Sequence, residues 1–184
     1  NHITMVGTEA GVGVNLNGVI AGTQSVSVDA NGHLSINGTL QSDTSLVAKA
    51  NSIQNTKTIA SGGNLSLETK ELTNTGHITS AKNGYVKVKE TLTNKNTMAA
   101  GANTQGALTG NGSLTIEAGT VRNTDAVIVS GGTTTINSKE VHNIENGRIY
   151  GGKVAIQTKV LENRKNIALE SKLDAAMADM KARS

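Results

Sequence analysis

The sequence has no cysteine, proline, phenylalanine or tryptophan, and its aromatic residues are Tyr85 and Tyr150 alone. Without cysteine the chain has no disulfide scaffold, no cysteine-ligated zinc site and no thiol nucleophile. A compact domain of this length usually builds its core around aromatic side chains, because they bury the largest area per residue. The core must instead consist of Leu, Ile, Val, Ala and Met, which favours a stacked, repetitive structure over a small sandwich or barrel.

Long apolar runs and strong charge are also missing. No run of about 18 apolar residues is present, so no membrane-spanning helix is expected. No basic segment followed by an apolar one indicates a signal peptide within this sequence, and an internal piece of a longer secreted chain would have the same appearance. The net charge of +3 is too small, and stacking aromatics are too few, to favour nucleic acid as a partner.

Charge is distributed unevenly along the chain. Residues 1–62 contain two lysines and three acids, whereas residues 63–184 contain fifteen Lys or Arg and eleven acids. Two interpretations follow: an ordinary solvated surface, or a mildly basic patch toward the C-terminal end that meets an acidic partner.

What is present is an internal repeat. A triplet of the form aliphatic-x-Asn begins at Ile53, Leu72, Leu92, Val121, Val141 and Leu161, with steps of 19, 20, 29, 20 and 20 residues. Two earlier copies begin at Val14 and Leu34 and carry an aliphatic residue in place of the asparagine. A repeat of nearly constant length indicates the fold more strongly than the secondary-structure propensity of any single segment does.

The rest of each unit repeats as well. Six residues after each of the first six starts stands an apolar residue: Ile20, Leu40, Ile59, Ile78, Met98 or Val127. A corner of Gly, Asn and Ser follows, and then an alternating pair: Val26 and Val28, Leu46 and Ala48, Leu65 and Leu67, Val86 and Val88, Leu114 and Ile116, Thr134 and Ile136, Val154 and Ile156. Alternation with period two places one face of each short strand inside.

These features predict an all-β fold, a parallel β-helix or solenoid with coils of about 19–20 residues that spans residues 1–166. A single coil cannot bury its apolar face, so stacked coils bury each other's. Proline is excluded because strand interiors must donate their N–H groups to the next coil. Seven to eight coils at about 4.8 Å each give a rod of roughly 35–40 Å.

The competing interpretations fit less well. Six Asn-Gly pairs are compatible with hairpins in an antiparallel sheet, but hairpins do not explain a return every 19–20 residues. A hexapeptide solenoid requires coils of about 18 residues, and the calcium-binding nonapeptide and leucine-rich patterns are absent.

The repeated asparagine is expected to form a structural ladder, in which each amide bonds the one above and below and caps the corner backbone. The alternative is a polar row that binds a ligand. The ladder residues are Asn55, Asn74, Asn94, Asn123, Asn143 and Asn163.

Two irregularities interrupt the repeat. The coil that begins at Leu92 carries nine extra residues, placed at about 99–112, which form either a neutral surface loop or a recognition loop. From Ile167 the apolar spacing changes to that of an amphipathic α-helix over 167–184, which caps the last coil or begins the next region of a longer chain.

The segment from Val141 to Ile156 contains Arg148, Ile149, Tyr150 and Gly151. It resembles the Arg-Ile-Tyr-Gly coil of filamentous haemagglutinin-type exoproteins, the secreted partners of two-partner secretion systems in Gram-negative bacteria. These include adhesins and contact-dependent growth inhibition toxins. The aliphatic-x-Asn units resemble the haemagglutinin repeats of that family over about residues 14–167, although Gly152 stands where an acidic residue is common.

The resemblance implies a right-handed β-helix that an outer-membrane transporter exports to the cell surface or medium. It implies contact with a host cell or a neighbouring bacterium, without membrane insertion. The four motif residues, Arg148 to Gly151, are a possible contact edge.

No catalytic, metal-binding or cofactor-binding constellation is evident. The four histidines, His2, His33, His77 and His142, are isolated near turns and share no metal spacing with carboxylates. Polysaccharide lyases and hydrolases also use β-helices, but they need paired carboxylates, and the five Asp here do not share a coil position. Three hypotheses remain: a structural rod, a binding module that uses its loop or motif edge, and a polysaccharide enzyme.

Overall fold

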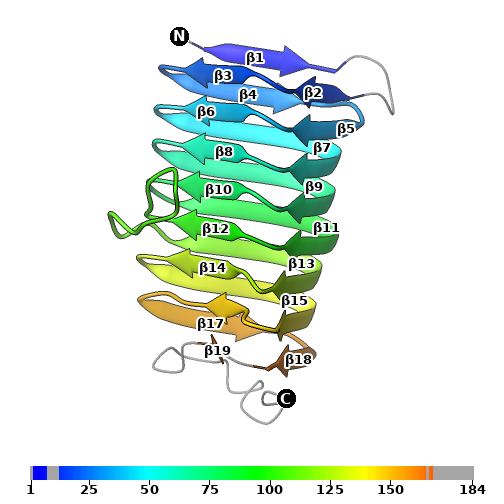
Figure 1. Ribbon diagram of the computed structural model, residues 1–184, viewed down its shortest axis with the longest axis vertical. Coiled ribbons are helices and arrows are strands. Elements are labelled where there is room, and N and C mark those ends of the chain that lie inside the picture. The colour runs from blue at the N-terminus through cyan, green and yellow to red at the C-terminus, as the bar shows by residue number, and fades with distance from the viewer. Residues whose placement is uncertain (1, 8–12, 165, 168–184) are drawn as a thin grey trace.

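Short alternating stretches separated by polar corners fold into strands that stack in parallel, each on its counterpart one coil away (Figure 1). The computed structural model describes residues 2–7, 13–164 and 166–167. The chain is a parallel β-solenoid, as its repeat predicts. Its strands are β1 (Ile3–Val6), β2 (Val14–Leu16), β3 (Val19–Gly22), β4 (Ser25–Asp29), β5 (His33–Ile36), β6 (Thr39–Ser42), β7 (Ser45–Asn55), β8 (Thr58–Ser61), β9 (Asn64–Asn74), β10 (His77–Ser80), β11 (Gly84–Asn94), β12 (Thr97–Ala100), β13 (Leu114–Thr124), β14 (Val127–Ser130), β15 (Thr133–Ile144), β16 (Arg148–Ile149), β17 (Lys153–Gln157), β18 (Val160–Asn163) and β19 (Asn166–Ile167).

Two parallel sheets make up the solenoid. The larger has 11 strands, with the path β1-β4-β7-β9-β11-β13-β15-β17 and with β2, β5 and β18 joined at its sides. The smaller has 8 strands, in the order β19-β16-β14-β12-β10-β8-β6-β3. Each coil therefore contributes one strand to the smaller sheet, which gives about eight turns.

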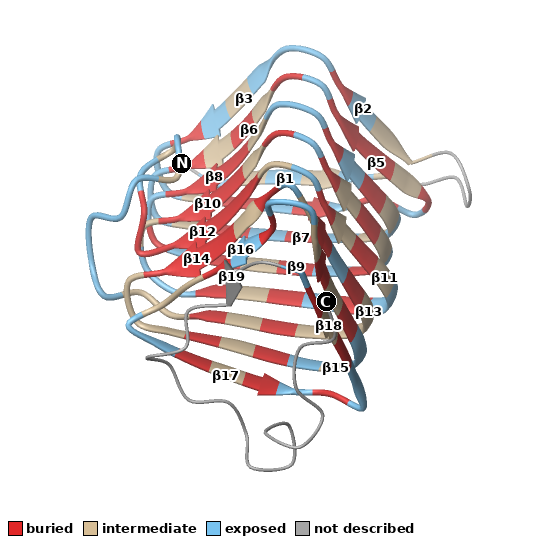
Figure 2. Cartoon of the chain, turned by 60° about the horizontal axis from the view of Figure 1, so that its bottom comes forward, coloured by how far each residue is buried: buried red, intermediate tan, exposed pale blue. Residues whose placement is uncertain are grey.

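The larger sheet bends within its long strands. Strands β7, β9, β11, β13 and β15 have 11 or 12 residues, whereas the first and last coils divide the same path into separate strands such as β4 and β5. The bend gives the coil three sides (Figure 2). Buried and exposed residues alternate along strands of the larger sheet such as β4 and β7, whereas β8, β10, β12 and β14 of the smaller sheet are almost wholly buried.

The core consists of columns of aliphatic side chains that run along the rod axis. One column in the smaller sheet is Leu40, Ile59, Ile78, Met98, Ile128 and Ile149. Each of these side chains is at most 1% exposed. Like residues stack on like residues because the register is continuous from coil to coil, so a thin interior is filled without aromatic rings.

The repeat pattern led to a wrong assignment at two places in these columns. Ile128, not Val127, occupies the column, because the corner before β14 is one residue longer and holds Asp125 at φ 48°. In β11 the column positions are Gly84 and Val86, opposite Leu65 and Leu67. The sequence assigned Val86 and Val88 instead, because Gly84 has no side chain to mark its position and a register shift follows Val88.

The described part of the solenoid ends in strand β19, which includes Ile167 and pairs it with Ile149. The strand thus includes the first residue of the region for which a helix was expected. The remainder of that helix, 168–184, lies outside the described residues.

Candidate functional site

The six ladder asparagines stand in one buried stack. Each donates from Nδ2 to Oδ1 of the next: Asn55 to Asn74, Asn74 to Asn94, Asn94 to Asn123, Asn123 to Asn143 and Asn143 to Asn163, at 2.8–2.9 Å. The first five are 0% exposed and Asn163 is 8% exposed. The stack is sealed from solvent, so its amide groups are not available to a ligand.

The same amides also cap the corner that follows each ladder strand. Asn74 Nδ2 donates to the carbonyl oxygens of Gly76 at 3.1 Å and Thr97 at 2.9 Å. Asn123 Nδ2 donates to the carbonyl oxygens of Ala126 at 2.9 Å and Arg148 at 3.2 Å. Asn74, Asn94 and Asn123 therefore each join their own corner to that of the next coil, a structural role.

Leu16 and Ile36 continue this column toward the N-terminus, where the register pairs Leu16 with Ile36 and Ile36 with Asn55. The column is thus aliphatic at one end and amide-filled from Asn55 onward.

The Arg148–Gly151 motif divides between core and surface. Ile149 lies in the aliphatic column at 0% exposure, whereas Arg148 is exposed. Tyr150 is half-buried and packs against an outer cluster of Ala99, Ala102 and Val129, and its carbonyl oxygen accepts a hydrogen bond from Thr134 Oγ1 at 2.7 Å. A Cβ on Gly151 would lie 2.4 Å from the carbonyl oxygen of Lys153, so this tight corner requires glycine.

The inserted loop runs from Gly101 to Ser113, between β12 and β13. Ala99 and Ala100, which the sequence placed in the loop, belong to β12. The loop is held by its own hydrogen bonds: Asn103 Oδ1 accepts from the backbone N–H groups of Gln105 and Ala107, both at 3.0 Å.

Beside this loop lies a shallow cleft of about 400 Å³. Its lining includes Gln41 of β6, Ala60 of β8 and Thr79 of β10, with Asn103 and Thr104 from the loop. The lining offers hydroxyl and amide groups but no aromatic ring, so it lacks a stacking platform for a sugar.

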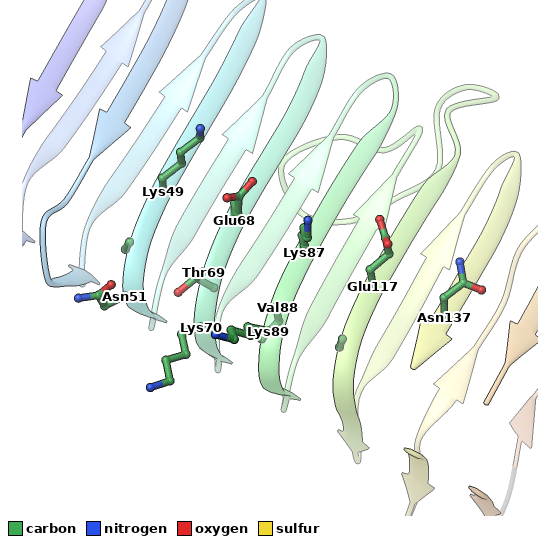
Figure 3. Close-up of a pocket in the computed structure, with 12 residues that line it drawn as sticks. Lys49, Asn51, Glu68, Thr69, Lys70, Lys87, Val88, Lys89, Glu117 and Asn137 are labelled. Carbon is green, nitrogen blue, oxygen red and sulfur yellow. The ribbon is translucent and has the colours of Figure 1, made fainter. Parts of the chain in front are cut away.

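A larger groove of about 610 Å³ follows the bend of the larger sheet. Lys49, Glu68, Lys87, Glu117 and Asn137 form one wall, a row along the rod axis (Figure 3). Lys70 and Lys89 belong to the opposite wall. Sequence analysis missed this groove, because Glu117 and Asn137 align with the earlier members only after the inserted loop has been placed.

At the C-terminal end, His142 lies between two carboxylates. Its Nδ1 is 2.8 Å from Glu162 Oε1 and its Nε2 is 2.9 Å from Glu140 Oε1. Glu162 also accepts from Arg164, at 2.9 Å from Nη2. Both ring nitrogens of His142 therefore face carboxylate oxygens.

Because of these contacts, the stability of the folded chain at low pH depends on Glu162. Hydrogen bonds from His142 and then Arg164 hold the pKa of Glu162 below its ordinary value. A lowered pKa stabilises the folded chain above the ordinary glutamate pKa of about 4.3, and this contribution is lost as pH falls through the folded value. We expect Glu162→Gln to cost roughly 0.5–1 kcal/mol at pH 7 and to flatten the acid limb of a urea-midpoint profile from pH 7 to pH 2.5.

Glu71→Gln is the matched control, since Glu71 forms none of the ion pairs found in the described chain. Identical acid limbs for Glu162→Gln and the unmodified protein would contradict this role of Glu162.

The other histidines show no common site. His2 and His33 hydrogen-bond Ser25 and Ser52, and Nδ1 of His77 is buried without a partner. Within residues 2–7, 13–164 and 166–167, no three His, Asp or Glu side chains are placed to hold a metal ion. No helix in that same part of the chain is long and apolar enough to cross a membrane.

Comparisons of the chain with protein-family models, with curated proteins and with solved structures find no match. The fold and the sites above therefore rest on the chain's own geometry.

Proposed function

We propose that the chain is a non-catalytic rod segment of a large bacterial surface exoprotein of the filamentous haemagglutinin type, coiled with the right hand of that family. The observation that carries this proposal is the unbroken stack of coils with a sealed interior. Aliphatic columns and the asparagine ladder account for the repeated residues, and each has a mechanical role. Such a stack is a rigid spacer that holds other domains at a distance from the cell.

The proposal includes the cellular setting that the resemblance implies. The parent chain would be exported by an outer-membrane transporter of a Gram-negative cell and displayed or released there. The lack of cysteine is compatible with this route, because no disulfide can trap the chain in the periplasm before export.

The second candidate is a binding module, favoured by the loop Gly101–Ser113 and the cleft beside it. The loop stands off a regular rod, and insertions on solenoids often form the recognition surface.

Deleting residues 101–110 separates these two functions. The deletion leaves Asn111, Gly112 and Ser113 between β12 and β13, matching the three residues that join Ser61 to Leu65 in an earlier coil. We expect the shortened chain to fold, with a melting temperature within about 4 °C of the original, because the loop bonds chiefly to itself.

Beads coated with each form would then be counted on epithelial cells and on Gram-negative bacteria. A rod predicts equal, background-level attachment for the two forms. Attachment by the intact chain that the deletion abolishes would overturn the rod and support the binding module. Release of reducing sugars from polysaccharides would overturn both in favour of an enzyme.

A further inference from the structure

One outward-facing row on the larger sheet carries charges of alternating sign on consecutive rungs. The register pairs Asp29 with Lys49, Lys49 with Glu68, Glu68 with Lys87, and Lys87 with Glu117. Four of these side chains are exposed and Glu117 is half-buried. The charges along the rod therefore run minus, plus, minus, plus, minus, with a step of about 4.8 Å.

No member of the row forms a close ion pair within the described chain. Its ion pairs join Lys70 to Glu90 and link residues of the His142 cluster, and none includes a member of the row. Glu117 accepts a hydrogen bond from the Tyr85 hydroxyl, which raises the pKa of Tyr85. In Figure 3 the polar ends of Lys49, Glu68 and Lys87 stand away from the sheet, toward solvent.

On the side of the row away from the groove, most neighbouring side chains are short. The outward positions two residues earlier on the same strands are occupied by Ser27, Val47, Ser66, Tyr85, Thr115 and Thr135. Apart from Tyr85 these side chains are short, so a flat surface can approach the row along its whole length.

We propose that this row is a lateral self-association surface, on which two copies of the chain lie face to face with their rod axes antiparallel. The two copies are related by a two-fold axis that lies in the interface, parallel to the strands and midway between the rungs of Glu68 and Lys87. Rotation about this axis places the row of one copy opposite the row of the other, in reverse order. Glu68 then faces Lys87 of the second copy, and Lys49 faces Glu117 of the second copy. With their two symmetry equivalents these make four complementary pairs.

A second copy fits the row better than a ligand of one charge sign. An acidic polymer would gain from Lys49 and Lys87 but would meet Asp29, Glu68 and Glu117 in the same row. A surface whose charges alternate at the same step pairs Lys49, Glu68, Lys87 and Glu117 together, and a second coil stack has that step by construction.

The interaction is weak for one isolated pair of chains, because each exposed ion pair strengthens association by only about two- to fivefold. Sedimentation equilibrium of the 184-residue chain at about 0.1–1 mM protein is therefore the measurement. We expect dimers at about 20 mM NaCl and at least about tenfold weaker association at about 500 mM, where the Debye length falls below about 5 Å.

Charge-swapped variants test the pairing itself. Lys49→Glu/Lys87→Glu makes the row wholly acidic, and Glu68→Lys/Glu117→Lys makes all of it basic except Asp29. We expect each variant alone to be monomeric and an equimolar mixture to form heterodimers at low salt. Lys49→Gln/Lys87→Gln also abolishes association, without placing like charges on neighbouring rungs.

Lys57→Glu/Lys95→Glu is the matched control, because these exposed lysines lie at the corners before β8 and β12 and give the same change in net charge. It should dimerise like the original chain, and circular dichroism melting establishes that each variant is folded. Folded charge-swapped variants that associate like the original, a mixture that stays monomeric, or an original chain that is monomeric at 1 mM and 20 mM salt would each overturn the proposal.

Discussion

Replacing Asn94 with leucine should lower the free energy of unfolding by about 3–5 kcal/mol, although the two side chains have the same number of heavy atoms. Asn94 Nδ2 donates to Asn123 Oδ1 at 2.9 Å and to the Val127 carbonyl oxygen at 3.0 Å, and its Oδ1 accepts from Asn74. Leucine removes the donor that Asn123 Oδ1 and the Val127 carbonyl oxygen share, and each such buried acceptor left unbonded costs about 1–3 kcal/mol. Urea denaturation followed by circular dichroism measures the loss.

Asn55→Leu is the matched comparison, because Asn55 stands at the end of the ladder beside Ile36. It donates to Asn74 Oδ1 and to the His77 carbonyl oxygen but accepts from no other ladder amide. We expect a smaller cost, about 1–3 kcal/mol. Equal losses for Asn55→Leu and Asn94→Leu would show that the amides act singly and not as a chain of cooperating bonds.

The repeat predicted the solenoid because its geometry is local. Alternation within a coil fixes which side chains point inward, and the 19–20 residue return fixes which of them stack. The asparagine column was visible for the same reason, since the buried positions of a parallel stack admit few residue types.

The sequence did not predict which residues occupy the core columns in coils that contain an extra residue. In β11 the register shifts after Val88, and Gly84 fills an apolar column without showing an apolar side chain. At the corner before β14, Asp125 adopts φ 48° and absorbs one extra residue. Such corners change length without changing the pattern on either side, so periodicity alone does not locate the extra residue.

The charged row escaped notice for a related reason. Its members are separated by 20, 19, 19 and 30 residues, so Glu117 aligns with the other four only after the insertion in the fifth coil has been removed from the count. Surface rows carry no hydrophobic pattern to guide such an alignment. The contacts of His142 with Glu140 and Glu162 likewise depend on side-chain geometry at the last coils.

The absence of proline has a direct test in Thr115→Pro, which should cost about 3–5 kcal/mol. Thr115 lies in β13, paired with Tyr85 of β11 on one side and Thr135 of β15 on the other. Its side chain points outward, so the substitution leaves the aliphatic columns intact. What it removes is a ladder N–H, and the ring takes the place of that hydrogen, so it also crowds the strand that accepted the bond and weakens that interface between coils. Thermal melting and urea denaturation measure the loss.

Thr104→Pro provides the contrast within the same chain. The Gly106 N–H donates to the Asn103 carbonyl oxygen at 3.0 Å, so Thr104 is the second residue of a four-residue turn, where proline is favoured. We expect a change within about 0.5 kcal/mol of zero. If both prolines proved equally harmful, the cost would come from proline in general and not from the strand N–H groups. A large loss at Thr115 alone identifies the coil-to-coil hydrogen bonds as the constraint that keeps proline out of the strands.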